Sequence, residues 1–423
     1  MAKELHELND LEERVILVAV EMDDRHSRSA METEACLDEL EELIRTAGAT
    51  AVARSIQKRE RIHPGHYLGT GKIEELKAML AAYNATGIVC DDELSPAQMK
   101  NLEQMLGTKV MDRTMVILDI FAARALSGEG KIQVELAQLK YRLSRLAGIG
   151  ASMSRLGGGI GTRGPGETKL ETDRRHIRRR IKSLEEELES LEKRRGLARA
   201  RREKDGVETV VIVGYTNAGK STLMNALTEA GVLAQDKLFA TLDPTSRALT
   251  LPDGRKVMLI DTVGFIRRLP HNLVEAFKST LEEAVCAKVI LNVCDASDDE
   301  CAEHLEVTNE LLNELGCSGK PTIPVFNKCD LENANVFLFN EPNAVRISAL
   351  EKKGLDELLE AISKALPPTR AKVRMLIPYS DGAAGAVMRK DGVISFEEYR
   401  ADGLYLELIA DVSLIDRYKD YCV

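Results

Sequence analysis

The sequence lacks the features that would place it in a membrane or outside the cell. No apolar run approaches the roughly 18 residues that a membrane-spanning helix needs, and the first ten residues, MAKELHELND, lack the apolar stretch of a signal peptide. The eight cysteines include no Cys-x-x-Cys pair and follow no regular spacing. We therefore expect a cytoplasmic protein with reduced cysteines, whose contact with a membrane, if it has one, is peripheral.

Acidic residues outnumber basic residues in the whole chain, but one segment is rich in basic residues. The chain carries 58 Lys and Arg against 68 Asp and Glu, a formal net charge of -10. Residues 139–182 contain twelve Lys or Arg and three acids, which gives this segment +9 and leaves -19 for the remainder. The overall charge argues against a general nucleic-acid binder, whereas the segment forms a local basic patch that suits a polyanion.

The 423 residues are too many for one typical domain of roughly 100 to 200 residues, so we expect three or four folded units. Residues 1–130 alternate short strand-like runs with amphipathic helical stretches, which predicts a small N-terminal α/β domain with a parallel sheet. The predicted strands are 14–20, 50–57 and 87–90. The predicted helices lie around 37–44, from about 72, and after Ser95, which can cap a helix that has Pro96 at its first position.

Residues 131–206 change to a pattern in which Leu and Ile recur every three or four positions. The pattern covers 132–146 and again 177–191, and it predicts two long helices paired antiparallel. Between them, 157–166 is too rich in glycine for regular structure, so it should form the loop at the tip of this hairpin. The charged residues 193–204 predict a solvated connection to the next strand.

Residues 207–368 return to buried strand-like runs separated by helix-length segments. The runs are 209–213, 257–260, 289–293 and 322–326, and they predict a doubly wound, mostly parallel sheet. Residues 369–423 follow a Pro-Pro pair and show alternation at 405–412, which predicts a small C-terminal α/β domain.

A phosphate-binding loop follows the first strand of the 207–368 region. Residues 214–221 match GxxxxGK[ST] directly after a strand and directly before a helix, the context that this motif requires. Backbone N–H groups can surround the β-phosphate, the Lys220 ammonium can reach the β- and γ-phosphates, and the Ser221 hydroxyl can bind Mg²⁺. The predicted nucleotide contacts here are Gly214, Tyr215, Thr216, Asn217, Ala218, Gly219, Lys220, Ser221 and Thr222.

Three further motifs follow in the order typical of a P-loop GTPase domain. Asp261-Thr262-Val263-Gly264 ends a strand, where Asp261 can hold Mg²⁺ through water and the Gly264 N–H can meet the γ-phosphate. The Asp330 carboxylate of Asn327-Lys328-Cys329-Asp330 suits the N1–H and amino group of guanine, which selects GTP. Ser348-Ala349-Leu350 supports the base from the other side. Together the four motifs predict a protein that binds GTP and GDP and hydrolyses GTP.

The catalytic residues are assigned from the same motifs. Lys220, Gly264 and a switch threonine are expected to act on the γ-phosphate, and the threonine should also bind Mg²⁺. We assign it to Thr241, in a segment that begins with the predicted nucleotide contact Phe239; Thr245 is the alternative. Phe265 stands where many small GTPases have the glutamine that orients water, so the intrinsic rate should be low and a partner or an ion should complete the site. Asn217 matches the asparagine of K⁺-stimulated GTPases; the alternative is that it only supports the loop.

The chain resembles the HflX family of ribosome-associated GTPases over nearly its whole length. The resemblance is carried by residues 67–72, 112–114, 120–122, 129–139 and, above all, by the run Gly-Gly-Gly-Ile-Gly-Thr-Arg-Gly-Pro-Gly-Glu-Thr within 157–171. It implies a protein that binds the 50S subunit and 70S ribosomes, splits stalled ribosomes with GTP, and leaves after hydrolysis. Nothing in the sequence suggests an obligate oligomer, so we expect a monomer. The hairpin would enter near the peptidyl-transferase centre. The expected RNA contacts are Arg155, Gly157, Gly158, Gly159, Arg163, Arg174, Arg175, Arg178 and Arg179.

Two other functions stay open at this point. The first is a GTPase that assists ribosome assembly or RNA modification, and the second is a GTP-timed regulator of a membrane protease or an RNA-decay partner. A basic glycine-rich loop favours RNA over a purely protein partner.

Three weaker patterns resemble sites but are interpreted as structure. Residues 159–164 match GxGxxG but follow a helix rather than a strand, which excludes a dinucleotide fingerprint. Residues 69–72 resemble a shortened phosphate loop that could take ATP, but a turn that starts a helix is favoured. Residues 63–66, His-Pro-Gly-His, have no further ligands at metal-site spacing and should form a loop.

Overall fold

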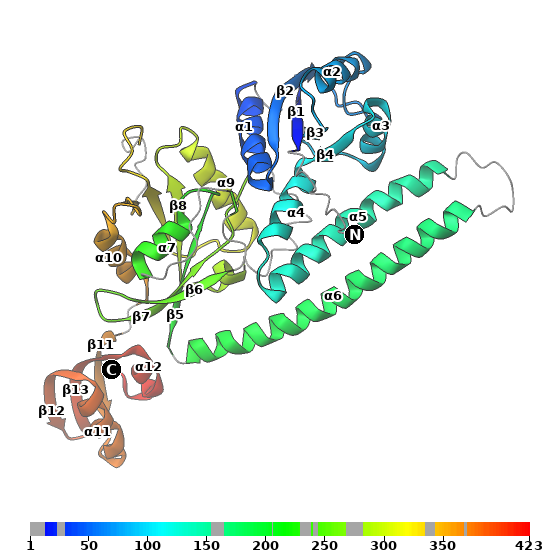
Figure 1. The fold of residues 1–423 in the computed structure, drawn as a ribbon. Helices are drawn as coiled ribbons and strands as arrows, with labels where there is room; N and C mark the ends of the chain where they lie inside the picture. The colour runs from blue at the N-terminus through cyan, green and yellow to red at the C-terminus, as the bar shows by residue number, and fades with distance from the viewer. Residues whose placement is uncertain are drawn as a thin grey trace, which may run out of the picture. The chain divides into compact units, whose positions relative to one another are not determined.

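The computed structural model describes residues 13–22, 30–153, 165–204, 206–228, 238–239, 244–267, 282–334, 343–367 and 370–423 (Figure 1). The chain forms two compact units, Met1–Ala361 and Ile362–Val423. The first unit contains a four-stranded sheet, a helical hairpin and a six-stranded sheet, and the second contains a three-stranded sheet.

The N-terminal sheet is entirely parallel, as predicted, and its strand order is β2-β1-β3-β4. Alternate residues of β1 face opposite sides, so Leu17 packs with α1 and α4 while Val18 packs with α2 and α3. The Ser95 hydroxyl accepts a bond from the Gln98 N–H, and the predicted cap with Pro96 is confirmed. Strand β4 and helix α4 had not been predicted. The elements are β1 (Arg14–Met22), α1 (Ala30–Ala47), β2 (Thr50–Arg59), α2 (Thr70–Ala82), β3 (Gly87–Cys90), α3 (Pro96–Leu106), β4 (Lys109–Asp112) and α4 (Arg113–Arg124).

The predicted hairpin consists of α5 (Gly128–Met153) and α6 (Pro165–Lys204), joined by an apolar seam that includes Leu136 and Leu184. Two details differ from the prediction. Helix α6 begins at Pro165, inside the segment expected to be loop, because proline suits the first helical turn. Residues 193–204 are mostly exposed and lead to the next strand, as expected, but they do so as a helix, since α6 continues to Lys204 and charges pair along it, as Lys193 does with Glu189 at 2.8 Å.

The six-stranded sheet has the order β10-β9-β8-β5-β7-β6 and is parallel except for β6, which confirms the predicted doubly wound, mostly parallel sheet. Helix α7 packs against β5, β6 and β7, and α9 packs against β5 and β8. Strand β5 lies between β7 and β8, so the order of the chain reverses there and its carboxyl end opens at a switch point. The elements are β5 (Glu208–Gly214), α7 (Lys220–Thr228), β6 (Thr245–Thr250), β7 (Lys256–Asp261), β8 (Val289–Asp295), α9 (Cys301–Glu314), β9 (Thr322–Asn327), β10 (Val345–Arg346) and α10 (Leu355–Ala365).

The C-terminal sheet is antiparallel, with order β11-β13-β12. The alternation predicted over 405–412 falls on β13, whose Leu404, Leu406 and Leu408 are buried in one core with Met388 of α11. The small α/β unit is therefore confirmed, while the division of the whole chain into four domains stays a prediction. The elements are β11 (Arg370–Ile377), α11 (Gly382–Asp391), β12 (Val393–Arg400), β13 (Gly403–Asp411) and α12 (Val412–Arg417).

The cysteines depart from the expectation of a fully reduced protein. Cys294 at the end of β8 and Cys301 at the start of α9 form a disulfide, with their Cα atoms 6.2 Å apart. The other six cysteines form no disulfide. The two positions are seven residues apart in sequence, and only the turn between strand and helix brings them together. Within the described part of the chain, no helix is both long and apolar enough to span a bilayer.

Candidate nucleotide-binding site

The phosphate-binding loop runs from the end of β5 to the start of α7. Two of its positions require glycine because a Cβ atom there would clash with a neighbouring residue. Gly214 has φ +145°, and a Cβ there would lie 2.0 Å from the Val293 carbonyl oxygen. Gly219 has φ +89°, and a Cβ there would lie 2.2 Å from Nδ2 of Asn327. A side chain at 214 would displace the backbone of β8, and one at 219 would displace the Asn327 amide; both positions also have a positive φ, which favours glycine.

Asn327 joins three of the four predicted motifs. Its Nδ2 donates to the Ala218 carbonyl oxygen at 2.9 Å, and its Oδ1 accepts from the Ala349 N–H at 3.0 Å. The residue is 2% exposed. One buried amide therefore fixes the phosphate loop against the Ser-Ala-Leu turn, and sequence reasoning had assigned it only to the nucleotide.

Lys220 and Ser221 lie at the start of α7 and face the end of β7. The Lys220 ammonium donates to the carbonyl oxygens of Gly214 at 3.0 Å and Tyr215 at 2.6 Å. Burial lowers the pKa of Lys220 to about 8, and the carboxylate of Asp261 opposes this shift. The Ser221 hydroxyl donates to Oδ2 of Asp261 at 2.8 Å.

The oxygens of Ser221 and Asp261 fit Mg²⁺, which prefers hard oxygen ligands and keeps several positions for water and phosphate. In the ranges that the structure describes, no group of three or more His, Cys, Asp or Glu side chains could hold a metal ion. Beside a nucleotide, Mg²⁺ usually takes only one or two protein ligands, and the rest are water and phosphate.

The Asp-Thr-Val-Gly segment is hydrogen-bonded directly to the phosphate loop. The Phe265 N–H donates to the Gly214 carbonyl at 3.0 Å, and the Thr216 N–H donates to the Phe265 carbonyl at 2.7 Å. A Cβ on Gly264 would lie 2.7 Å from Cγ2 of Thr216 and 2.9 Å from Nζ of Lys220, so Gly264 is close to the predicted phosphate-binding groups. The Phe265 side chain is buried in the core with Val211 and Val213, where it cannot orient a water molecule.

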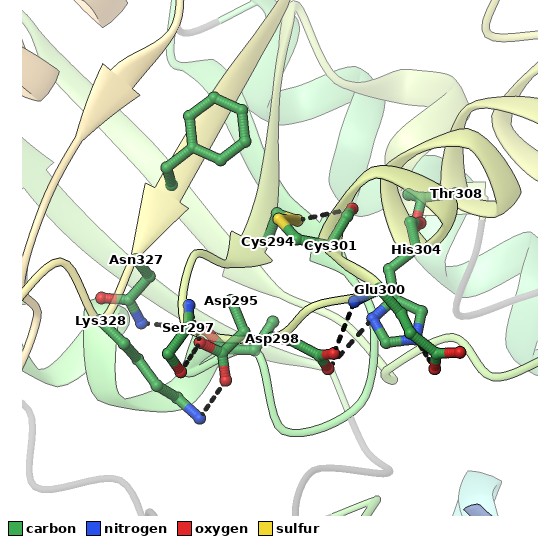
Figure 2. The surroundings of a disulfide bond; sticks show 12 residues. Cys294, Asp295, Ser297, Asp298, Glu300, Cys301, His304, Thr308, Asn327 and Lys328 are labelled. Carbon is green, nitrogen blue, oxygen red and sulfur yellow. Dashed lines mark hydrogen bonds and ion pairs between the residues drawn. A yellow bond between two sulfur atoms is a disulfide. The ribbon is translucent and has the colours of Figure 1, made fainter. Parts of the chain in front are cut away.

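The residues predicted to recognise guanine lie beside the turn between β8 and α9. The Lys328 ammonium pairs with Oδ2 of Asp295 at 2.6 Å (Figure 2). Ser348 and Ala349 are buried, whereas Asp330 and Leu350 are exposed. The exposed Asp330 carboxylate is free to meet a base that enters from solvent.

The turn between β8 and α9 also contacts the phosphate loop, which no motif indicated. The His304 ring of α9 stacks on the Tyr215 ring with centroids 3.7 Å apart. Burial lowers the pKa of His304, and its Nδ1 lies 3.5 Å from Oδ2 of Asp298 (Figure 2). From the segment after Phe265, the Arg267 guanidinium reaches Glu300 at 3.2 Å. These contacts join residues that are far apart in sequence, so no local pattern could reveal them.

Helix α1 of the N-terminal sheet reaches the same loop. The Tyr215 hydroxyl contacts Glu39 and accepts from the Arg267 N–H at 2.8 Å. Arg113 pairs with Glu39, pairs with Asp91 at 2.8 Å, and donates to the Arg267 carbonyl at 3.3 Å. A cavity of about 960 Å³ opens beside the loop, and its lining combines loop residues with the acidic side chains Glu34, Asp38, Glu39 and Glu42 of α1.

The remaining predicted site residues are placed as follows. Thr241 lies outside the described residues, whereas its alternative Thr245 is the first residue of β6 and stands opposite Asp261. Phe239 is buried and packs edge-on against Phe121, with centroids 4.6 Å apart. Asn217 has φ +62° and lines the cavity. Thr222 is half-buried on α7.

The predicted RNA contacts divide into two groups. Arg155, Gly157, Gly158, Gly159 and Arg163 lie outside the described residues. The others lie on the first turns of α6, where Arg174 is half-buried and Arg175, Arg178 and Arg179 are exposed. The neighbouring Arg180, which the charge pattern had grouped with them, pairs with both carboxylate oxygens of Glu135 at 2.7 and 2.8 Å.

The patterns interpreted as structure are confirmed where the structure describes them. Helix α2 begins at Thr70 after Gly69, as expected for a helix-start turn. His63 Nδ1 accepts bonds from the N–H groups of Gly65 and His66, which makes 63–66 a turn.

Three protein-family profiles match consecutive parts of the chain. They are described as "GTP-binding GTPase N-terminal" over residues 34–122, "GTP-binding GTPase Middle Region" over 124–202, and "50S ribosome-binding GTPase" over 209–328. A protein named GTPase HflX from Lacrimispora saccharolytica is 56% identical over 419 residues, which cover 99% of this chain and 98% of that protein.

Two further relatives carry the same name. The GTPase HflX of Caldanaerobacter subterraneus subsp. tengcongensis is 49% identical over 99% of this chain and 96% of its own length. The GTPase HflX of Escherichia coli is 45% identical over 82% of each chain. The four nucleotide motifs on a P-loop GTPase fold agree with these likenesses. This chain belongs to the HflX family of GTPases.

Proposed function

We propose that this GTPase binds the 50S subunit of the ribosome through its helical hairpin, splits stalled or idle 70S ribosomes in the GTP-bound state, and hydrolyses GTP to leave. It would act in the cytoplasm as a monomer. The observation that carries this proposal is the exposed basic row Arg175, Arg178 and Arg179 on the hairpin, at the end of α6 that adjoins the glycine-rich segment. Guanidinium groups on one exposed stretch of helix suit the phosphates of RNA.

The nucleotide roles follow from the geometry at the start of α7. The Lys220 ammonium would exchange its two carbonyl partners for β- and γ-phosphate oxygens, and the backbone N–H groups of residues 214–222 would surround the β-phosphate. Ser221 would bind Mg²⁺ directly, and Asp261 would hold it through water. Mg²⁺ would neutralise charge on the phosphates. Gly264 would offer its N–H to the γ-phosphate, where a larger residue would clash with Thr216.

The base would lie beside the turn between β8 and α9. Asp330 would accept from the N1–H and amino group of guanine, Lys328 would cover the base, and the Ser348-Ala349-Leu350 turn would close the other side. The Asn327 amide supports this arrangement because it holds the phosphate loop and the Ala349 N–H together.

Catalysis would require a group other than Phe265 to orient the attacking water. Because the Phe265 side chain is buried, intrinsic turnover should be low and the ribosome should raise it. Thr241 is our candidate for the switch threonine, with Thr245 as the alternative. Asn217 would hold K⁺ near the phosphates. Turnover that is unchanged when K⁺ is replaced by Na⁺ would contradict this last role.

The decisive experiment measures GTP turnover with and without purified 50S subunits and 70S ribosomes. A triple variant with Arg175, Arg178 and Arg179 changed to Ala is compared with a matched variant that changes Lys193, Arg194 and Arg201, which are exposed on the far half of the same helix. Both variants lose three positive charges. We expect about tenfold or greater stimulation, equivalent to about 1.4 kcal/mol in the barrier, in wild type and control but not in the first variant.

Ribosome splitting is measured in the same series by sedimentation of 70S ribosomes with GTP. Release of 50S and 30S subunits supports the proposal. Binding to immature subunits without release from 70S ribosomes would favour a role in assembly. Equal behaviour of the two triple variants would refute docking through the basic row.

A further inference from the structure

A partly buried ion pair joins the last turns of α6 to the segment that follows the Asp-Thr-Val-Gly motif. The Arg199 guanidinium donates to Oε1 of Glu283 at 2.8 and 3.2 Å and reaches Oε2 of Glu282 at 3.4 Å. The Glu283 side chain is 9% exposed and the Arg199 side chain 21%. Because Glu283 is nearly buried, removing Arg199 leaves its carboxylate with little solvent to replace the lost partner, so the pair should hold the two segments together.

The ion pair matters for the nucleotide site because Glu283 is next to a residue that packs in one core cluster with Phe265. Phe265 follows Gly264, the residue predicted to meet the γ-phosphate, and Glu282 is the first described residue after the 268–281 stretch. Ala284, which is next to Glu283, is 0% exposed and packs in the same core cluster as Phe265. Phe265 in turn is hydrogen-bonded to Gly214 and Thr216 of the phosphate loop. Arg199 is therefore linked to the nucleotide site through its ion pair with Glu283, the core cluster shared by Ala284 and Phe265, and the hydrogen bonds of Phe265 to the phosphate loop.

Contacts between α5 and α6 would carry a movement of the hairpin tip to Arg199. Helix α6 has 40 residues, which corresponds to a length of about 60 Å. It is attached to α5 by the apolar seam and by the ion pair of Arg180 with Glu135. At the base, Arg195 of α6 pairs with Glu129 in the first turn of α5 at 3.0 Å. Both helices should therefore move together when the tip is held.

A cavity lies at the base of the hairpin. It is lined by both helices and by two segments of the GTPase region, one around Pro244 and the other around Glu283. Its volume is about 280 Å³, and its lining includes Gln133 of α5, Arg195 of α6, Pro244 just before β6, Ser246 of β6, and Glu283. Pro244 belongs to the segment that we expect to carry the switch threonine. Because α6 is not close-packed against the two segments at this cavity, a small shift of α6 there meets less steric hindrance than in a close-packed interior.

We propose that Arg199 and Glu283 are positioning residues that couple docking of the hairpin to the GTPase site. This inference rests on the proposed function. Docking of the tip shifts α6, Arg199 carries Glu283 and Ala284 with it, and Phe265 and Gly264 adopt the position in which hydrolysis is fast. The pair does not touch GTP, and its effect is on the stimulated rate.

The test compares GTP turnover, at a series of 50S concentrations, for wild type, Arg199→Ala, Glu283→Gln and the double variant with Arg199→Glu and Glu283→Arg. Lys193→Ala is the matched control, because Lys193 lies on the same helix in an exposed pair with Glu189. Cosedimentation with 50S subunits is measured in parallel. We expect the maximal stimulation to fall about tenfold in each single variant, within the range of known couplings, at an unchanged half-saturating 50S concentration.

The charge-reversed double variant should recover much of the stimulation, which loss of folding could not explain. Stimulation in Arg199→Ala equal to that in Lys193→Ala would overturn the inference alone. So would a loss of cosedimentation in Arg199→Ala, since the pair would then act on docking. Wild-type protein that 50S subunits neither bind nor stimulate would overturn the proposed function, and this inference with it.

Discussion

Replacing Asn327 by Ala should damage both the fold of the GTPase domain and nucleotide binding. The change removes a donor to Ala218 at 2.9 Å and an acceptor from Ala349 at 3.0 Å in a site that is 2% exposed. Each buried partner left without a hydrogen bond costs about 1–3 kcal/mol, so the free energy of unfolding should fall by about 4 kcal/mol. That is a large part of the roughly 5–15 kcal/mol that stabilises a domain.

Nucleotide affinity should fall together with stability. If about two-thirds of the lost free energy comes from the arrangement that binds nucleotide, the dissociation constant for GDP should rise about 100-fold, equivalent to about 2.7 kcal/mol. Asn327→Asp should be at least as harmful, because it keeps the acceptor for Ala349 but places a carboxylate oxygen beside the Ala218 carbonyl. The assays are displacement of a fluorescent GDP analogue and urea unfolding followed by circular dichroism, since the chain has no tryptophan.

Asn333→Ala is the matched control for this prediction. Its amide is exposed and makes a 2.9 Å bond to the Ser297 carbonyl from the same side of the domain. An exposed bond of this kind contributes about 1 kcal/mol or less. The reasoning would be refuted if Asn327→Ala bound GDP as wild type does and unfolded at the same urea concentration as Asn333→Ala.

Three further predictions follow from the site. Burial lowers the pKa of Lys220 from 10.5 to about 8, so the free protein loses this charge between pH 7 and pH 9; GDP affinity should fall about tenfold over that range, and Lys220→Met should remove most of this dependence. Gly264→Ala brings a Cβ within 2.7 Å of the Thr216 side chain, so GTP turnover should fall more than GDP affinity; an equal loss of both would contradict a role at the γ-phosphate. Because Cys294 and Cys301 form a disulfide, alkylation of unfolded, unreduced protein should label six of the eight cysteines, and all eight after reduction; eight labels without reduction would exclude the bond.

Local patterns predicted most of the strands and helices because burial follows the period of each element. The fully buried parallel strands are continuous apolar runs in the sequence. The two helices of the hairpin are segments in which Leu and Ile recur every three or four positions. The errors lie where local signals are ambiguous. The charged end of α6 is an exposed connection, as expected, but the charge pattern did not show that it is helical, with charges that pair along the helix as Lys193 and Glu189 do. Pro165 resembles loop but suits a first helical turn.

The site was predictable to the extent that its chemistry lies in contiguous segments. The phosphate loop, Asp261 to Gly264, Asn327 to Asp330 and the Ser-Ala-Leu turn each follow a strand, and parallel strands end at one edge of a sheet. Their proximity therefore follows from topology. The stacking of His304 on Tyr215 does not, because nothing in either segment specifies the other.

The sequence by itself determined the order of the elements, the four motifs and the nucleotide that they suit, since each depends on residues only a few positions apart. The tertiary structure decided which side chains join those parts. Asn327 meets Ala218 across 109 positions, Arg199 meets Glu283 across 84, and Arg113 meets Arg267 across 154. A single polar residue is equally compatible with solvent and with a buried partner, and only the packing of distant strands and helices selects between them.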